Sequence, residues 1–155
     1  MKRTFLVIAA ILMFLAPSIF AQDKGLGVGV IVGQPTGFSV KSWLNEKNAL
    51  DFGLGFSFAK NDNNVHIHAD YLWHSFSAIN SPTQKFVLYY GPGLKIRTGK
   101  SNVDAELGIR GVIGIAWMAH TVPIDVFLEV APVLEFVPGT GFNMDAGFGA
   151  RYYFE

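Results

Sequence analysis

The chain contains no cysteine, which excludes disulfide bonds and any lipid anchor attached through a cysteine. Charge is also scarce and balanced, with 12 lysines and arginines against 12 aspartates and glutamates and no basic run. A nearly neutral chain without a basic patch gives no reason to expect a nucleic-acid partner. Beyond residue 21 the sequence also lacks an apolar run approaching the ~18–20 residues that a membrane-spanning helix needs.

The N-terminal end has the composition of a secretory signal peptide. Lys2 and Arg3 supply the positive start, and an apolar run follows over residues 5–16. We expect a cleaved signal peptide over residues 1–21 and a single mature domain over residues 22–155. A retained anchor helix is the alternative, but the apolar run is shorter than the ~20 residues that cross a bilayer.

The mature chain alternates between apolar and small or polar residues with a period of two, which is typical of β-strands. Pro92 and Pro132 lie inside two of these stretches, where a proline removes a ladder donor, so we expect a bulge or a bend near each. Short turn sequences separate the stretches. Eight of them predict an all-β domain, an eight-stranded antiparallel up-and-down barrel: residues 25–33, 38–44, 50–58, 65–74, 86–97, 103–117, 124–136 and 142–154.

Alternation alone does not distinguish a membrane barrel from a soluble, lipocalin-like barrel with an apolar interior. The volume of the side chains favours the membrane barrel. The apolar face carries many large residues, whereas the interior of an eight-stranded barrel is only just wide enough for side chains to fill. The opposite face is rich in glycine and short polar residues. We therefore expect the apolar face to point outward into lipid, as in a transmembrane barrel.

Aromatic residues on the apolar face gather near the ends of the predicted strands. Two aromatic girdles at the membrane interfaces are typical of transmembrane barrels. Trp43 does not fit this pattern, because its parity places it on the polar face. One girdle is predicted from Trp73, Trp117, Tyr152 and Phe154, and the other from Phe38, Phe58, Phe136 and Phe142.

The end of the chain, Ala150-Arg151-Tyr152-Tyr153-Phe154, alternates and closes on an aromatic residue before Glu155. This ending resembles the C-terminal assembly signal of eight-stranded outer-membrane barrels of the OmpA-transmembrane-domain and OmpX kind. The mature chain also looks similar to small outer-membrane-barrel families without assigned chemistry. The resemblance implies residence in a Gram-negative outer membrane, contact with its lipid, and insertion by the assembly machinery that reads the last strand. It implies no particular activity.

The inward face is predicted to carry charges of both signs. In a narrow lumen these charges must be paired or hydrated. We therefore expect a plugged interior, and a narrow pore is the alternative. The predicted lumenal charge network consists of Lys41, Asp51, Asp70, Lys95, Arg97, Asp104, Glu106, Arg110, Asp125, Glu129, Glu135, Asp145 and Arg151.

Four residues of one predicted strand, His66, His68, Asp70 and His74, share a face and combine imidazole with carboxylate, a plausible zinc set. Side chains two apart on a strand are separated by roughly 6–7 Å, too far to share an ion comfortably. A hydrogen-bonding role in the lumen is therefore favoured over a metal site, and no other cofactor is indicated.

Catalysis is not indicated either. Ser75 is the serine that adjoins a histidine, His74, but successive residues of a strand point to opposite faces. We therefore expect an outer-membrane protein in a structural or surface-interaction role. An adhesin or a receptor for an extracellular ligand is the first alternative, disfavoured because the predicted surface connections are short. A membrane-embedded lipid A-modifying enzyme is the second.

Overall fold

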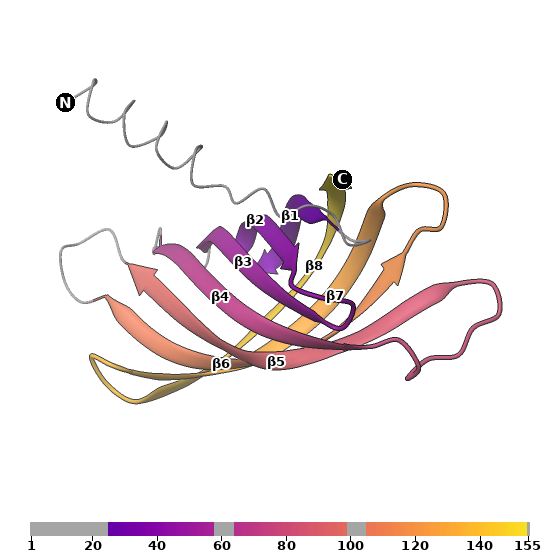
Figure 1. Ribbon diagram of the computed structural model, residues 1–155. Helices are drawn as coiled ribbons and strands as arrows, with labels where there is room; N and C mark the ends of the chain where they lie inside the picture. Colours follow the sequence, from indigo (N-terminus) through magenta and orange to yellow (C-terminus); the bar gives the residue numbers. More distant parts are fainter. Residues whose placement is uncertain (1–24, 58–63, 99–104, 155) are drawn as a thin grey trace, which may run out of the picture.

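The computed structural model describes residues 25–57, 64–98 and 105–154. Within these residues all regular structure is β, and eight antiparallel strands close into a single barrel (Figure 1). Each strand pairs with its neighbours along the chain, and the last strand pairs with the first. The predicted eight-stranded up-and-down barrel is therefore confirmed. The strands are β1 (Leu26–Gln34), β2 (Thr36–Trp43), β3 (Asn48–Ser57), β4 (Asn64–Ser75), β5 (Lys85–Thr98), β6 (Glu106–Met118), β7 (Ile124–Val137) and β8 (Gly141–Phe154).

The period of two sorts the side chains of each strand between the two faces of the wall. In β1, Val28, Val30 and Val32 are exposed, whereas Gly27 and Ile31 are buried. The same alternation continues around the barrel, because successive side chains of a strand point to opposite faces. No described residue that was predicted to point outward is buried. The predicted assignment of inside and outside is therefore confirmed for the described strands.

The aromatic residues predicted for the two girdles lie on the outer wall. Trp117 is half-buried, and its indole Nε1 donates a hydrogen bond to Oε1 of Gln84 over 2.5 Å. Phe58 lies outside the described residues. Trp43 points inward, as its parity indicates, and is buried. The exposed members of the girdles are Phe38, Trp73, Phe136, Phe142, Tyr152 and Phe154.

Pro92 and Pro132 each interrupt the ladder on one side. Pro92 pairs with Gly111 of β6, but pairing with β4 lapses beside it and resumes in the same register. Pro132 keeps its pairing with β8 and loses it on the β6 side. A proline has no N–H to donate, which accounts for both lapses. The register shift between β6 and β7 lies further along, between Leu107 and Gly108.

The outer wall is hollowed where these lapses occur. Pro92, Gly111 and Pro132 occupy outward positions of three successive strands, and a hollow of about 640 Å³ lies over them. A Cβ atom added to Gly111 would meet nothing within 4 Å, so the wall is open there. Large apolar residues contribute to the lining: Leu50, Tyr71, Leu94, Ile109, Leu134 and Phe142.

Candidate functional site

The lumen accommodates large side chains because glycines lie opposite them. Tyr89 reaches over Gly114, and His68 reaches over Gly53. A Cβ atom at those glycines would lie 2.2 Å and 2.1 Å, respectively, from the nearest ring atom. Both distances are far below van der Waals contact, so a larger residue at either glycine would displace the ring. Gly53 and Gly114 therefore lie on the inner wall, where they leave room for these rings.

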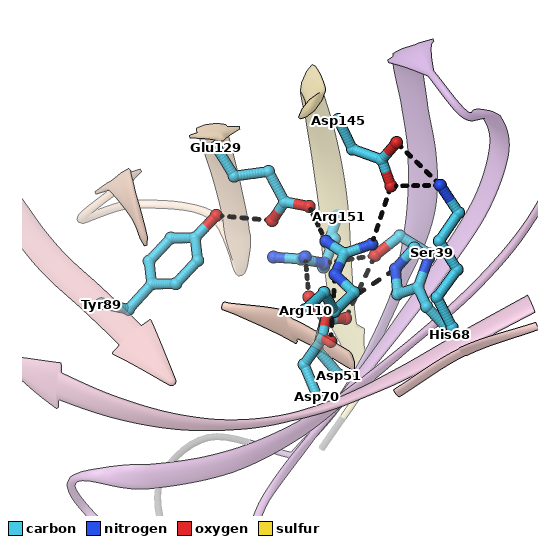
Figure 2. A network of polar contacts seen from close by, with 10 residues as sticks. Ser39, Asp51, His68, Asp70, Tyr89, Arg110, Glu129, Asp145 and Arg151 are labelled. Atoms are coloured by element: carbon cyan, nitrogen blue, oxygen red, sulfur yellow. Dashed lines mark hydrogen bonds and ion pairs between the residues drawn. The ribbon is translucent and has the colours of Figure 1, made fainter. Parts of the chain in front are cut away.

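The first of two ion-paired clusters is centred on Arg110 of β6 (Figure 2). Its Nε lies 3.2 Å from Oδ1 of Asp70, its Nη2 lies 3.3 Å from Oε1 of Glu129, and its Nη1 lies 3.6 Å from Oδ2 of Asp145. These carboxylates belong to β4, β7 and β8. One buried guanidinium therefore joins four strands across the lumen.

Two donors complete the Arg110 cluster. Nζ of Lys95, on β5, donates to both carboxylate oxygens of Asp145 over 2.8 Å. The hydroxyl of Tyr89 donates to Oε2 of Glu129 over 2.9 Å. Burial of a charge is costly unless partners compensate it. In this cluster both Asp145 and Glu129 have two such partners.

The second cluster is centred on Arg151 of β8. Its Nε donates to Oγ of Ser39 over 2.8 Å, and its Nη2 donates to Oδ2 of Asp51 over 2.6 Å. On the other side its Nη1 lies 3.5 Å from Oδ2 of Asp125, and its guanidinium carbon lies 3.7 Å from the ring centroid of Phe127. The side chain is 1% exposed, so these contacts are made away from water.

Aromatic side chains extend the network around Arg151. The hydroxyl of Tyr153 donates to Oδ2 of Asp125 over 2.6 Å. Lys41 is fully buried, and its Nζ lies 4.9 Å from the ring centroid of Trp43 and 4.8 Å from that of Tyr89. Cations within about 6 Å of an aromatic face are stabilised by the ring quadrupole. Rings as well as carboxylates therefore hold the lumenal cations.

Another part of the lumen is apolar, which the sequence analysis did not anticipate. In the sequence only the alternation of side chains along a strand indicates this apolar part. Leu72, for example, lies between the outward Tyr71 and Trp73 and must therefore point inward. Apolar residues at such positions pack together inside the barrel. The buried cluster consists of Ile31, Leu72, Tyr89, Val112, Ala116, Phe127 and Ala131.

Most of the predicted lumenal charges are inward and buried: Lys41, Asp51, Asp70, Lys95, Arg110, Asp125, Glu129, Asp145 and Arg151. Arg97 and Glu106 are half-buried and pair with each other, with Nε 2.5 Å from Oε2. Glu135 is also half-buried, and Asp104 lies outside the described residues. Neutral hydroxyls carry no charge signal in a sequence, and three of them were missed as members of the clusters: Ser39, Tyr89 and Tyr153.

The four residues of the zinc hypothesis, His66, His68, Asp70 and His74, point inward and are buried. Among the described residues, however, no three His, Cys, Asp or Glu side chains come together as a metal site. Nε2 of His68 lies 3.9 Å from Oδ2 of Asp70, and Nδ1 of His74 lies 3.1 Å from the backbone oxygen of Lys47. The strand thus aligns these residues without gathering them around one point.

Ser75 and His74 lie on opposite faces of β4, as alternation predicts. His74 is buried in the lumen, with its ring centroid 4.3 Å from that of Trp43. Ser75 is half-buried at an outward position. A nucleophile and its base must be within hydrogen-bonding reach of each other, and this pair is separated by the wall.

No protein-family model matches the chain, and no match was found among curated proteins or solved structures. The described residues include no helix long and apolar enough to cross a membrane. Function is therefore inferred from the lumen and the outer wall themselves.

Proposed function

We propose that the mature chain is an integral outer-membrane β-barrel protein with a plugged polar lumen, in a structural or surface-interaction role and without catalysis. The observation that carries this proposal is the distribution of polarity, with ion pairs inside and large apolar side chains outside. Phe142 is 68% exposed, Leu94 62% and Phe38 59%. Soluble proteins rarely expose apolar patches larger than a few hundred Å², whereas lipid covers such a wall.

A soluble carrier of the lipocalin kind needs the reverse arrangement. Such a barrel holds its ligand in an interior cavity. Here the inward positions of neighbouring strands are occupied by Arg110, Glu129 and Asp145, and both carboxylates contact the Arg110 guanidinium inside the lumen. The space that a ligand needs is therefore filled by ion pairs, which supports the membrane barrel over the carrier.

The heat-modifiable mobility of the protein, extracted from a washed outer-membrane fraction, tests the location. A closed strand ladder leaves no edge to attack, so we expect the barrel to stay folded in SDS and its band to shift on boiling. The mature N-terminus is expected at Gln22. Recovery in the soluble periplasmic fraction without a shift would contradict the proposal and favour a carrier.

Conductance in planar bilayers tests the plug separately. An ion crossing the lumen has to separate the buried pairs of Arg110 and Arg151, and a buried charge without its partner is costly. We therefore expect no stable channel openings. Regular stepwise conductance would refute the plug and would leave the location untouched, so the two parts of the proposal fail independently.

The last strand is the proposed contact with the outer-membrane assembly machinery. Phe154 is exposed and pairs with Leu26 across the closure of the barrel. If the assembly machinery recognises Phe154 during insertion, Phe154→Ala lowers the amount of protein in the outer membrane. Phe142→Ala, another exposed outward position of β8, is the matched control and is expected to insert normally. An equal loss in both variants would argue against recognition of the terminus.

A further inference from the structure

The contact between β1 and β8 differs from every other strand contact in the barrel. All other neighbouring strands follow one another along the chain, whereas these two are joined by pairing alone, from Leu26↔Phe154 to Gln34↔Ala146. The entropic cost of bringing two segments together grows with the length of chain between them. We call the β1–β8 contact the seam. Because no short connection holds these two strands together, its closure depends more than that of the other contacts on the interactions between the strands themselves.

Arg151 crosses this seam inside the lumen. In the register of the sheet Arg151 lies beside Gly29 of β1, and Gly29 lies beside Ser39 of β2. The guanidinium nevertheless reaches past β1, donating to Oγ of Ser39 over 2.8 Å and to Oδ2 of Asp51, on β3, over 2.6 Å. Hydrogen bonds of Arg151 thus link β8 to β2 and β3, although β1 lies between β8 and β2 in the sheet.

The close approach of β8 to β1 beside Arg151 depends on the absence of a side chain at Gly29. A Cβ atom there would lie 1.9 Å from the backbone oxygen of Ala150 and 2.7 Å from Cα of Arg151. Such contacts would push β8 away from β1. Glycine at this position therefore permits the close approach of the two strands at the point where Arg151 crosses the seam.

The guanidinium is also held from β7. Nη1 lies 3.5 Å from Oδ2 of Asp125, and the guanidinium carbon lies 3.7 Å from the ring centroid of Phe127. Arg151 is therefore anchored on the β7 side and bonded on the β2–β3 side, with the seam between (Figure 2 shows its contacts with Ser39 and Asp51). Charge-assisted hydrogen bonds in a water-excluded site are stronger than neutral bonds.

We propose that the β1–β8 seam is the place where this barrel opens, and that Arg151, Ser39 and Asp51 form a latch that keeps it closed from inside. Opening the seam would expose the unpaired edges of two strands, which are templates for pairing with another strand. The proposal concerns the closure of the barrel and does not depend on the medium that surrounds it.

Hydrogen exchange measured by mass spectrometry on the folded, full-length protein tests the latch. In Arg151→Gln we expect the amides of β1 and β8 to exchange about tenfold faster or more, since loss of a charge-assisted hydrogen bond shifts an opening equilibrium by that order. The amides of β5 and β6, remote from the seam, are expected to keep their rates. Equal acceleration in all strands, or none in the seam, would overturn the proposal.

Ser39→Ala keeps the test decisive if Arg151→Gln does not fold. This change removes the bond from Arg151 to Ser39 and the bond that Ser39 donates to Asp51 over 3.3 Å, and it leaves the ion pairs of Arg151 intact. Because the ion pairs of Arg151 with Asp51 and Asp125 remain, we expect a smaller acceleration than in Arg151→Gln, of about a few-fold, again confined to β1 and β8. Unchanged exchange in this variant would mean that Ser39 does not hold the seam.

The absence of cysteine allows a rescue experiment. Val30→Cys with Ala150→Cys places a disulfide across the seam, and Val40→Cys with Phe52→Cys places one across β2 and β3. The seam disulfide is expected to restore slow exchange to Arg151→Gln, and the control disulfide is not. Equal rescue by the two would show that Arg151 stabilises the barrel as a whole and does not act at the seam.

Discussion

The ion-paired part of the lumen and its apolar part are built from the same inward positions, but they place different demands on the chain. In the Arg110 cluster the guanidinium has carboxylate partners from three other strands at distances of 3.2 to 3.6 Å. The apolar cluster around Leu72 and Val112 needs only suitable volume. Buried charges require particular partners, whereas apolar side chains tolerate exchanges of similar size. The polar region therefore sets the relative positions of the strands, and the apolar region fills the space between them.

The largest expected effect follows from removing the centre of the polar region. Arg110→Met leaves the carboxylates of Asp70, Glu129 and Asp145 without this cation, and we expect the barrel to lose about 3–5 kcal/mol of unfolding free energy. Denaturant unfolding of the detergent-solubilised protein, followed by tryptophan fluorescence, measures the loss. Arg97→Met is the control, because its pair with Glu106 is half-exposed and is worth about 1 kcal/mol or less. Equal losses would remove the distinction between fully buried and half-exposed ion pairs.

An intermediate effect is expected at Tyr89, which belongs to both regions. Tyr89→Phe keeps the ring in the apolar cluster and removes the hydroxyl that donates to Glu129. Since Glu129 retains Arg110, the expected loss is about 1 kcal/mol, in the range of a single hydrogen bond. The same denaturant titration applies. If the loss of unfolding free energy matched that of Arg110→Met, the Tyr89 hydroxyl would stabilise the barrel as much as the guanidinium does, which would contradict the expected ranking.

The smallest effect is expected in the apolar region. Leu72→Met preserves volume and apolarity in the buried cluster, so the unfolding free energy should change by less than about 1.5 kcal/mol. Asp145→Asn, a change of similar size in the polar region, removes the charge that receives two bonds from Lys95 and should cost more. A larger loss of unfolding free energy in Leu72→Met than in Asp145→Asn would contradict the different roles of the two regions.

Alternation was sufficient to predict the strands, the barrel and the face on which each residue lies, because a period of two depends only on local geometry. The contacts inside the lumen were not predictable in this way. Ser39 and Arg151 are far apart in the chain, and they meet because both register with Gly29. Registers depend on turn geometry and on how the sheet closes, which local patterns do not encode. The apolar cluster was not predicted for a different reason: its residues share the parity of the lumenal charges but carry no charge that marks them as inward.

The two prolines in the wall have a consequence for how the barrel tolerates interruption. Where an ordinary residue loses its ladder partner, a donor and an acceptor are both left without a bond, and each such group costs about 1–3 kcal/mol in a dry setting. At Pro92 and Pro132 the donor does not exist, so each proline leaves one unpaired backbone group fewer than another residue would. The hollow over these positions is lined mainly by apolar residues, and Asp70 and Arg110 also contribute to its lining. The ladder is thus interrupted at two residues that leave one polar backbone group fewer without a hydrogen bond.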